Sequence, residues 1–215
     1  MAGTYVRLTA RHLLAGYAQG IFPMSMARGD DELHWFDPPR RGILPLDGFH
    51  VSRSLRRRVA QGAWSATLNH DFAGTVDACA GRAETWINAP LRAMYLDLHA
   101  AGHAHSLEVW QDGALAGAVF GVSLGGAFFG ESMVSRRTDG SKVALLWLTG
   151  HLLRCGFTLL DTQYLTPHLA SLGGIEISRA TYRRMLEQAL SRRGNPRRYP
   201  LPDLQEIRQR ITQTS

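Results

Sequence analysis

Residues 106–135 constrain the fold of this chain more than any other segment. They read SLEVWQDGALAGAVFGVSLGGAFFGESMVS, and two turn signals, Asp112-Gly113 and Gly125-Gly126, divide them into apolar runs. Glycine-containing dipeptides between apolar runs are typical of hairpin turns. The segment therefore predicts three strands that follow one another in an antiparallel meander.

The patterns on either side of this meander indicate the fold class. We expect helices at 9–19, 52–62, 71–80, 88–101 and 139–155 and a last one ending near 191, with further strands at 63–69, 159–163 and 175–178. Antiparallel strands followed by helix, strand and helix are typical of an α+β domain with a mixed sheet. We therefore expect a small N-terminal domain over residues 1–61, which carries a basic helix, and a larger mixed-sheet domain over 62–215.

The composition excludes several classes of protein. Hydrophobic residues make up 45% of the 215, enough for a buried core. No apolar run approaches the ~18 to 20 residues of a membrane span, and the N-terminus lacks the blocks of a signal peptide. Cys79 and Cys155 are too few for a disulfide scaffold or a thiolate zinc site, and His103 and His105 have no third metal ligand at a suitable spacing. We expect a cytoplasmic protein with no membrane segment and no metal.

Arginines dominate the charge of the chain and cluster in two places. Lysine and arginine total 24 against 18 acidic residues, and Lys142 is the one lysine. Six arginines fall within residues 40–58 and seven within 179–198. Such clusters are typical of proteins that bind a polyanion, although solvated faces of unrelated proteins carry them too. Both explanations stay open at this point.

Glu131 is a carboxylate beside a hydrophobic wall, because it follows two phenylalanines at the end of an apolar strand. A carboxylate in such a place needs a partner. One interpretation is a salt bridge to Arg136 or Arg137, the neighbouring cations. The other is the capture of a cationic group of a substrate, which is strongest when the pair is partly desolvated.

Asp161 and Gln163 form a second polar pair at the end of an apolar strand. They stand at i and i+2 in LLDTQ, so on a regular strand both side chains leave the same face. Open sheets tend to place chemistry at the carboxyl ends of strands, and an Asp that orients a Gln gives a neutral hydrogen-bond acceptor for an amine. A simpler role for Asp161 is to cap the following helix.

The segment Arg137–Lys142 opens a helix and half resembles the pyrophosphate loop of GNAT-type acetyltransferases. Lys142 stands where that loop has a small residue. A side chain there crowds the backbone amides that bind the pyrophosphate, so the match to a coenzyme A site is incomplete.

Eight sequence blocks occur here in a family-specific order. They are GIFPM (20–24), HVSRS (50–54), TWI (85–87), GHAHSLEVW (102–110), FFGESM (128–133), SKVAL (141–145), DTQ (161–163) and HLASLG (168–173). In this order they resemble the leucyl/phenylalanyl-tRNA–protein transferases over roughly residues 8 to 190. The resemblance implies a small N-terminal domain and a GNAT-like C-terminal domain that has lost coenzyme A use. It also implies transfer of Leu or Phe, with Met a further candidate, from tRNA to the α-amine of proteins beginning with Arg or Lys, which marks them for N-degron proteolysis.

The same resemblance implies roles for particular residues and no cofactor, because an aminoacyl ester is already activated. Gln163, polarised by Asp161, receives the amine proton, and Glu131 pairs with the side chain of the acceptor's N-terminal Arg or Lys. The aminoacyl side-chain pocket is expected to contain Trp86, Phe128, Met133 and Leu160, together with Met24, where longer members of the family carry a Trp. Arg53 and Arg57 are expected to meet tRNA phosphates.

Three alternatives compete with this hypothesis. The first is the same reaction with a different acceptor specificity. The second is an acetyltransferase that uses acetyl-CoA, which rests on fold analogy and the incomplete loop. The third is an RNA-binding module without catalysis, which predicts tRNA binding that ignores aminoacylation.

Overall fold

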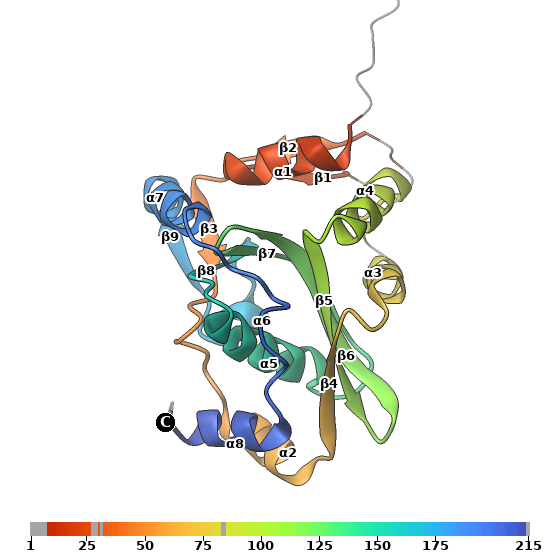
Figure 1. Cartoon of the computed structure of the whole chain (residues 1–215), viewed down its shortest axis with the longest axis vertical. Helices are drawn as coiled ribbons and strands as arrows, with labels where there is room; N and C mark the ends of the chain where they lie inside the picture. The colour runs from red at the N-terminus through yellow and green to blue at the C-terminus, as the bar shows by residue number, and fades with distance from the viewer. Residues whose placement is uncertain (1–7, 27–29, 31, 83–84, 214–215) are drawn as a thin grey trace, which may run out of the picture.

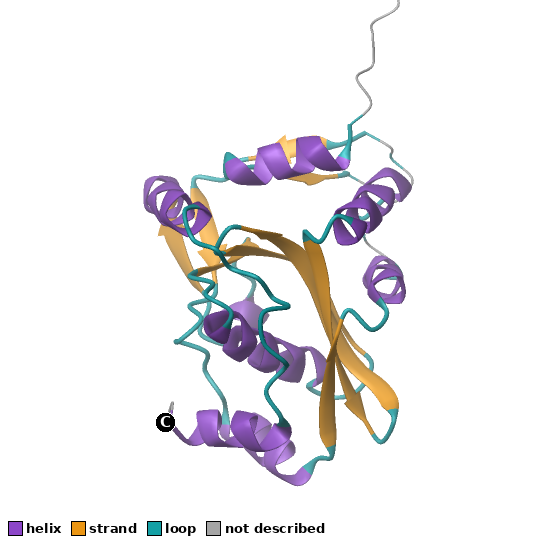
Figure 2. Cartoon of the chain, in the orientation of Figure 1, coloured by secondary structure: helices purple, strands orange, loops and turns teal. Residues whose placement is uncertain are grey.

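The computed structural model describes residues 8–26, 30, 32–82 and 85–213. Over this part of the chain seven strands form one mixed sheet, and helices cover both of its faces (Figures 1 and 2). The strands lie in the order β4-β5-β6-β7-β8-β3-β9. This architecture confirms the predicted α+β class.

The predicted meander forms one half of the sheet. Its strands are β5 (Ala104–Gln111), β6 (Ala114–Leu124) and β7 (Ala127–Ser135), each antiparallel to the next, and β4 (Trp64–Leu68) pairs with β5. Between β5 and β6, Asp112 and Gly113 have φ values of 52° and 74°. Positive φ at both central residues suits a two-residue hairpin turn, so the turn signal read from the sequence is confirmed.

The other half of the sheet is assembled from segments far apart in the sequence. β8 (Leu159–Gln163) lies parallel to β7, and β3 (Arg40–Ile43) lies antiparallel between β8 and β9 (Ile175–Ser178). Parallel neighbours need a crossover connection, which contains helix α5 (Gly140–Arg154). The predicted domain boundary after residue 61 would therefore place β3 in one domain and its partner strands, β8 and β9, in the other.

The helices divide between two apolar cores, one on each face of the sheet (Figure 1). One core contains α5 with α2 (Arg53–Gln61), α6 (Pro167–Ala170) and α8 (Leu204–Gln213). The other contains α1 (Ala10–Ala18), α3 (Phe72–Ala80), α4 (Ala89–Ala100) and α7 (Arg179–Leu190). Because α5 packs on the sheet and also contacts α2 and α8, most of its residues are buried, which explains its weakly amphipathic sequence.

A small N-terminal unit sits at one end of the sheet. Two short strands, β1 (Phe22–Met24) and β2 (His34–Phe36), pair antiparallel, and α1 packs on β1 and on α4 (Figure 1). The helix predicted at 9–19 is confirmed as α1, whereas β1 was not predicted from the sequence. This unit brings Phe22 and Met24 to the cavity described below.

The sequence predicted no membrane segment and no metal site, and both expectations can be compared with the residues that the structure describes. No helix among them has the length and apolar character to cross a bilayer. No group of three or more His, Cys, Asp and Glu side chains among them could hold a metal ion. Cys79 and Cys155 are both buried and free.

Candidate functional site

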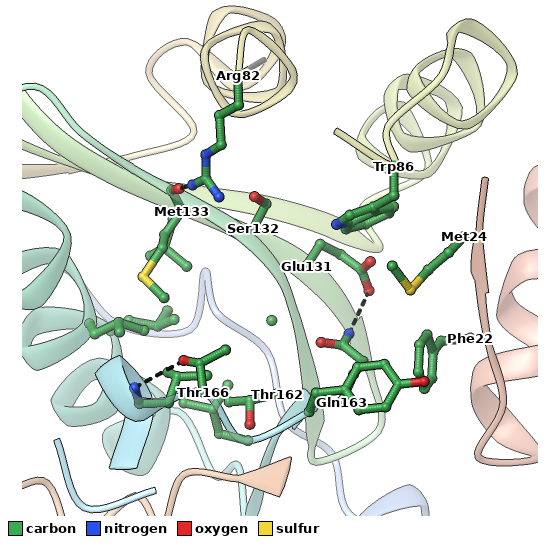
Figure 3. A pocket seen from close by; sticks show the side chains of 17 residues that line it. Phe22, Met24, Arg82, Trp86, Glu131, Ser132, Met133, Thr162, Gln163 and Thr166 are labelled. Carbon is green, nitrogen blue, oxygen red and sulfur yellow. Dashed lines mark hydrogen bonds between the residues drawn. The ribbon is translucent and has the colours of Figure 1, made fainter. Parts of the chain in front are cut away.

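β7 and β8 separate soon after their pairing begins, and the separation opens a cavity. Three Cα pairs join the two strands, and the last pair is Phe129 with Asp161. Beyond it β7 continues along β6, while β8 stays on β3. The cavity between them has a volume of about 230 Å³ (Figure 3). The two strand ends therefore supply the walls of a candidate site.

Apolar side chains form most of the cavity wall. They are Phe22, Met24, Trp86, Val119, Met133, Leu145, Leu148, Leu160 and Leu169. Four of the five residues predicted for an aminoacyl side-chain pocket, namely Trp86, Met133, Leu160 and Met24, are thus brought together. The volume lies below the range of about 300–1,000 Å³ that is usual for small-molecule and cofactor sites, and it suits one amino-acid side chain better than a cofactor.

Phe128, the fifth residue predicted for the pocket, lies in the core instead. It is 1% exposed and packs against Phe157, with ring centroids 6.2 Å apart. Its Cα pairs with that of Leu160, at a level where β7 and β8 are still joined. The sheet is closed there, so Phe128 supports the cavity without lining it.

Glu131 owes its position to a β-bulge. In the β6–β7 ladder Gly121 pairs with Gly130 and Phe120 with Ser132, so Glu131 is an extra residue on β7. A bulge interrupts the alternation of a strand and re-aims a side chain. Here it turns the Glu131 carboxylate into the cavity, toward Gln163 (Figure 3).

The partners of Glu131 are hydroxyl groups, not arginines. Tyr17 from α1 donates to its Oε1 and Tyr95 from α4 to its Oε2, both at 2.7 Å. The Nε2 of Gln163 lies 3.4 Å from Oε1. A salt bridge from Glu131 to Arg136 or Arg137 was one interpretation of the sequence, and the hydroxyl partners do not support it. Glu131 is 8% exposed, and its carboxylate lacks a cation in direct contact among the described residues.

This environment raises the pKa of Glu131 to about 7. Burial is the main cause, because it disfavours the charged form. The hydroxyls of Tyr95 and Tyr17 favour the ionised carboxylate and oppose that effect, and the charge of Asp161 adds to it. Glu131 is therefore poised to change its charge near neutral pH.

Asp161 is fully buried and its two oxygens are occupied. Arg41 donates from Nε to Oδ1 at 2.9 Å and from Nη2 to Oδ2 at 2.6 Å. Tyr182 donates to Oδ2 at 2.6 Å, and the backbone N–H of Gln163 donates to Oδ1 at 2.8 Å. Asp161 does not cap a helix: Thr166 caps the next one, α6. Its contact with Gln163 runs through the main chain.

Arg41 is buried to the same degree as its partner. It is 1% exposed and lies between the rings of Phe22 and Tyr182, with its Cζ 4.5 and 4.4 Å from their centroids. Its Nη1 also donates to the carbonyl of Gly20 at 2.8 Å. The guanidinium thereby joins the N-terminal unit to β8 and α7, and a bidentate pair in this setting is rigid.

Gln163 ends β8 in an unusual backbone conformation. Its φ is 57°, in the left-handed region that non-glycine residues seldom occupy unless surrounding contacts impose it. Gly42 pairs with Gln163 and Ile43 with Asp161, so Thr162 is an extra residue in β8. For this reason Thr162 and Gln163 both line the cavity while Asp161 does not, in contrast to the strict alternation predicted from LLDTQ.

The predicted basic helix is present at α2. Ser52 caps it, Leu55 and Val59 are buried, and Arg53 and Arg57 are exposed. Their exposure leaves them able to meet a polyanion. Arg58 on the same helix is exposed as well, but its Nε pairs with Asp139 at 2.8 Å.

The start of α5 differs from a pyrophosphate site. Asp139 is its N-cap residue, and the Asp139 carboxylate pairs with Lys142 at 2.8 Å as well as with Arg58. A carboxylate at a helix N-terminus repels an anionic ligand, and here it also pairs with the two nearby cations. This arrangement gives the acetyl-CoA alternative no support.

Sequence reasoning missed the residues that support the two carboxylates. Tyr17 and Tyr95 look like ordinary core residues of amphipathic helices, and Arg41 looks like one more member of the basic cluster at 40–58. No local signal marks Arg41 or Tyr182 as buried, because Arg41 stands between Arg40 and Gly42 and Tyr182 follows Thr181 and precedes another arginine. These residues lie far from the two carboxylates in the sequence and come into contact with them only in the folded protein.

Comparison with known proteins gives matches along nearly the whole chain. The family model for the leucyl/phenylalanyl-tRNA protein transferase matches residues 43–187, and the model for the N-terminal domain of the same family matches residues 7–39.

Three curated proteins named leucyl/phenylalanyl-tRNA–protein transferase illustrate the similarity. Those of Cereibacter sphaeroides, Paracoccus denitrificans and Ruegeria pomeroyi are 60%, 56% and 58% identical to this chain. The alignments cover 97%, 97% and 94% of this chain and 98%, 98% and 97% of those proteins. Among solved structures, L-PGS from Bacillus licheniformis matches with a TM-score of 0.46 and 12% identity, over 85% of this chain and 71% of that chain.

Proposed function

Since the chain belongs to the leucyl/phenylalanyl-tRNA–protein transferase family, we propose that it transfers Leu or Phe from aminoacyl-tRNA to the N-terminal α-amine of proteins that begin with Arg or Lys. The observation that carries the proposal is the cavity between β7 and β8. It combines an apolar wall with the polar groups of Glu131 and Gln163 at one place.

The apolar part of the cavity suits the side chain of the transferred amino acid. Leu160, Met133 and Leu148 offer an apolar surface to an unbranched Cβ followed by a bulky group. A Cβ-branched side chain meets the wall close to its α-carbon, whereas one missing methylene costs only about 1–3 kcal/mol. Met24 is flexible, so the pocket is expected to accept Met as well.

The polar part of the cavity suits the acceptor. An aminoacyl ester is activated, so the enzyme has to orient the amine and the ester carbonyl and to remove a proton, without a cofactor. Gln163 holds the amine, Asp161 fixes Gln163 in place, and Glu131 pairs with the side chain of the acceptor's N-terminal Arg or Lys. The contacts of Asp161 with the backbone of Gln163 and with Arg41 support this division of roles.

The tRNA body is expected to bind through Arg53 and Arg57 on the exposed face of α2. Contacts with phosphates carry no sequence information, so the amino acid, not the tRNA identity, is expected to govern selection. Transfer of this kind marks the acceptor for N-degron proteolysis. Charged tRNA is a cytoplasmic substrate, and two free buried cysteines suit a reducing compartment, so we place the reaction in the cytoplasm.

The test is an addition assay read by mass spectrometry. The protein is incubated with Leu-tRNA, Phe-tRNA or Met-tRNA and with peptides that begin with Arg, Lys, Glu or Ala. We expect Leu or Phe to be added to the Arg and Lys peptides alone. Addition to Glu peptides overturns the acceptor assignment. No addition to any peptide, together with tRNA binding that ignores aminoacylation, overturns the transferase proposal in favour of a binding module.

A further inference from the structure

The proposed reaction, on which this inference rests, requires that the α-ammonium group of the acceptor lose a proton. An α-amine has a pKa of about 7.7–8.0, so much of it is an ammonium group at neutral pH and has no lone pair for attack on an ester. A group that takes the proton has to face the cavity, to be ionised beforehand and to be able to gain a proton without disrupting its own surroundings.

Asp161 does not meet these conditions. Its side chain does not line the cavity, and its oxygens accept four hydrogen bonds from Arg41, Tyr182 and the backbone of Gln163. Protonation of Asp161 would leave the buried Arg41 guanidinium without its counter-charge, which is strongly unfavourable. Asp161 is therefore a positioning residue that acts through Gln163.

Glu131 meets all three conditions. Its carboxylate faces the cavity beside Gln163 (Figure 3). Its close partners, the hydroxyls of Tyr17 and Tyr95, are neutral, so a proton on Glu131 leaves no charge unpaired. We propose that Glu131 is the catalytic base that accepts the proton of the acceptor's α-ammonium, while Gln163 donates from Nε2 to Glu131 and presents its Oε1 to the amine.

The steps balance without an added reagent. One proton moves from the ammonium nitrogen to Glu131, which becomes a neutral carboxylic acid. The nitrogen then forms a bond to the ester carbonyl carbon, and the bond from that carbon to the ribose oxygen of the tRNA breaks. A second proton of the nitrogen ends on the ribose oxygen. Glu131 releases its proton to solvent before the next turnover.

The surroundings of Glu131 tune it for this exchange. Among the described residues, the titratable and charged groups that act on it most are Tyr17 from α1, Tyr95 from α4, Asp161 from β8 and Arg41 from β3. Arg82 and Tyr164 line the same cavity. Burial raises the pKa values of both tyrosines well above 10, so they remain hydroxyl donors at neutral pH. Glu131, with a pKa of about 7, lies within about one unit of the amine that it serves.

The experiment is a set of pH–rate profiles under single turnover with saturating Leu-tRNA and an Arg-initiated peptide. For the unmodified protein, the rate should rise with pH through an inflection near 7, because only ionised Glu131 accepts a proton. For Glu131→Gln, we expect a loss of at least about 100-fold in kcat and the replacement of the inflection near 7 by one at the pKa of the free amine, about 7.7–8.0. For Tyr95→Phe, the inflection should move to higher pH, because the ionised carboxylate loses a donor.

A second acceptor separates proton removal from binding. An Arg-initiated peptide whose α-amine is replaced by an aminooxy group carries an unprotonated nucleophile at neutral pH. With this peptide at a saturating concentration, Glu131→Gln should transfer Leu at close to the rate of the unmodified protein, and any weaker binding of the acceptor should appear in KM alone. A defect that appears only in KM for the peptide, or a loss of equal size with the aminooxy acceptor, assigns Glu131 to binding and overturns the proposal.

Glu108→Gln is the matched control. Glu108 is also buried and accepts from the hydroxyls of Ser106 and Thr67, but it lies on β5 and does not line the cavity. This variant should keep the inflection near 7. Failure of the unmodified protein to transfer Leu contradicts the proposed function itself. Transfer by the unmodified protein and by Glu131→Gln with identical profiles contradicts the role of Glu131 alone.

Discussion

The ends of β7 and β8 lie on either side of one cavity, yet their buried carboxylates have opposite surroundings. Asp161 on β8 faces a bidentate arginine and a tyrosine, so its charge is neutralised and its geometry fixed. Glu131 on β7 meets only neutral donors in direct contact, so its charge is unfavourable near neutral pH. The comparison teaches that a buried carboxylate with a positioning role is held ionised by a counter-charge. A buried carboxylate that exchanges a proton instead lacks a cation in direct contact.

The largest expected effect is on the β8 side. Arg41→Met leaves Asp161 as an unpaired buried charge, which should lower the free energy of unfolding by about 3–5 kcal/mol. Thermal unfolding followed by circular dichroism should show a decrease in Tm on the order of 10 °C. The double variant Arg41→Met/Asp161→Asn should regain part of the loss, because an amide carries no charge. An unchanged Tm for Arg41→Met would contradict the account of this ion pair.

Removal of the charge on the β7 side should raise the free energy of unfolding, by an amount that depends on pH. Burial raises the pKa of Glu131 to about 7, above its value in the unfolded chain. The stabilisation from protonated Glu131 is therefore fully present below about pH 4.5 and is lost as pH rises through 7, a change of about 3 kcal/mol in total. Denaturant titrations at pH 5 and pH 8 should show that Glu131→Gln gains stability relative to the unmodified protein at the higher pH. A difference that stays constant between the two pH values counts against the raised pKa.

Asp161→Asn should damage the geometry of Gln163 more than the proton transfer. An amide group repels the Arg41 donors from one of its ends, so the left-handed backbone of Gln163 loses its support. Misplacement on this scale can lower kcat by about 100-fold. The pH inflection from Glu131 should persist and move to lower pH, because the charge of Asp161 raises that pKa and Arg41 lowers it. Loss of the inflection in this variant would show that the titrating group is Asp161 and not Glu131.

Matched hydroxyl deletions give the smallest and most selective effects. Tyr182→Phe removes a donor from Asp161 and should lower the free energy of unfolding by about 1–3 kcal/mol without moving the inflection to higher pH. Tyr17→Phe removes a donor from Glu131 and should move the inflection to higher pH. Unfolding curves and pH–rate profiles for both variants, measured together, decide whether the two carboxylates are distinct. Equal shifts of the inflection in both variants would show that Asp161 and Glu131 do not have separate roles.

The sequence predicted elements whose signals are local. The meander follows from Asp112-Gly113, and α2 follows from Ser52 with its apolar stripe. The position of β3 between β8 and β9 could not be predicted, because a four-residue strand carries little periodic signal and its partners lie more than 100 residues away.

In the candidate site, too, residues with a local sequence signal were predicted and residues without one were not. Sequence blocks led to Glu131, Gln163 and most of the pocket, since these residues lie within recognisable motifs. They did not reveal the partners of Glu131 and Asp161, nor that Phe128 lies below the cavity. Those facts depend on two bulges, at Glu131 and Thr162, which change the face that each side chain takes.

The most direct test of the central claim is the titration of Glu131 itself. Carbon-13 NMR of protein labelled at the side-chain carboxyl carbons of glutamate, with Glu131→Gln used to assign the resonance, reports the protonation of this one group. We predict that the Glu131 signal titrates near pH 7. A midpoint below pH 5 would show that the carboxylate is stably ionised in the folded protein, and Glu131 would then have no role as a base poised for the α-ammonium.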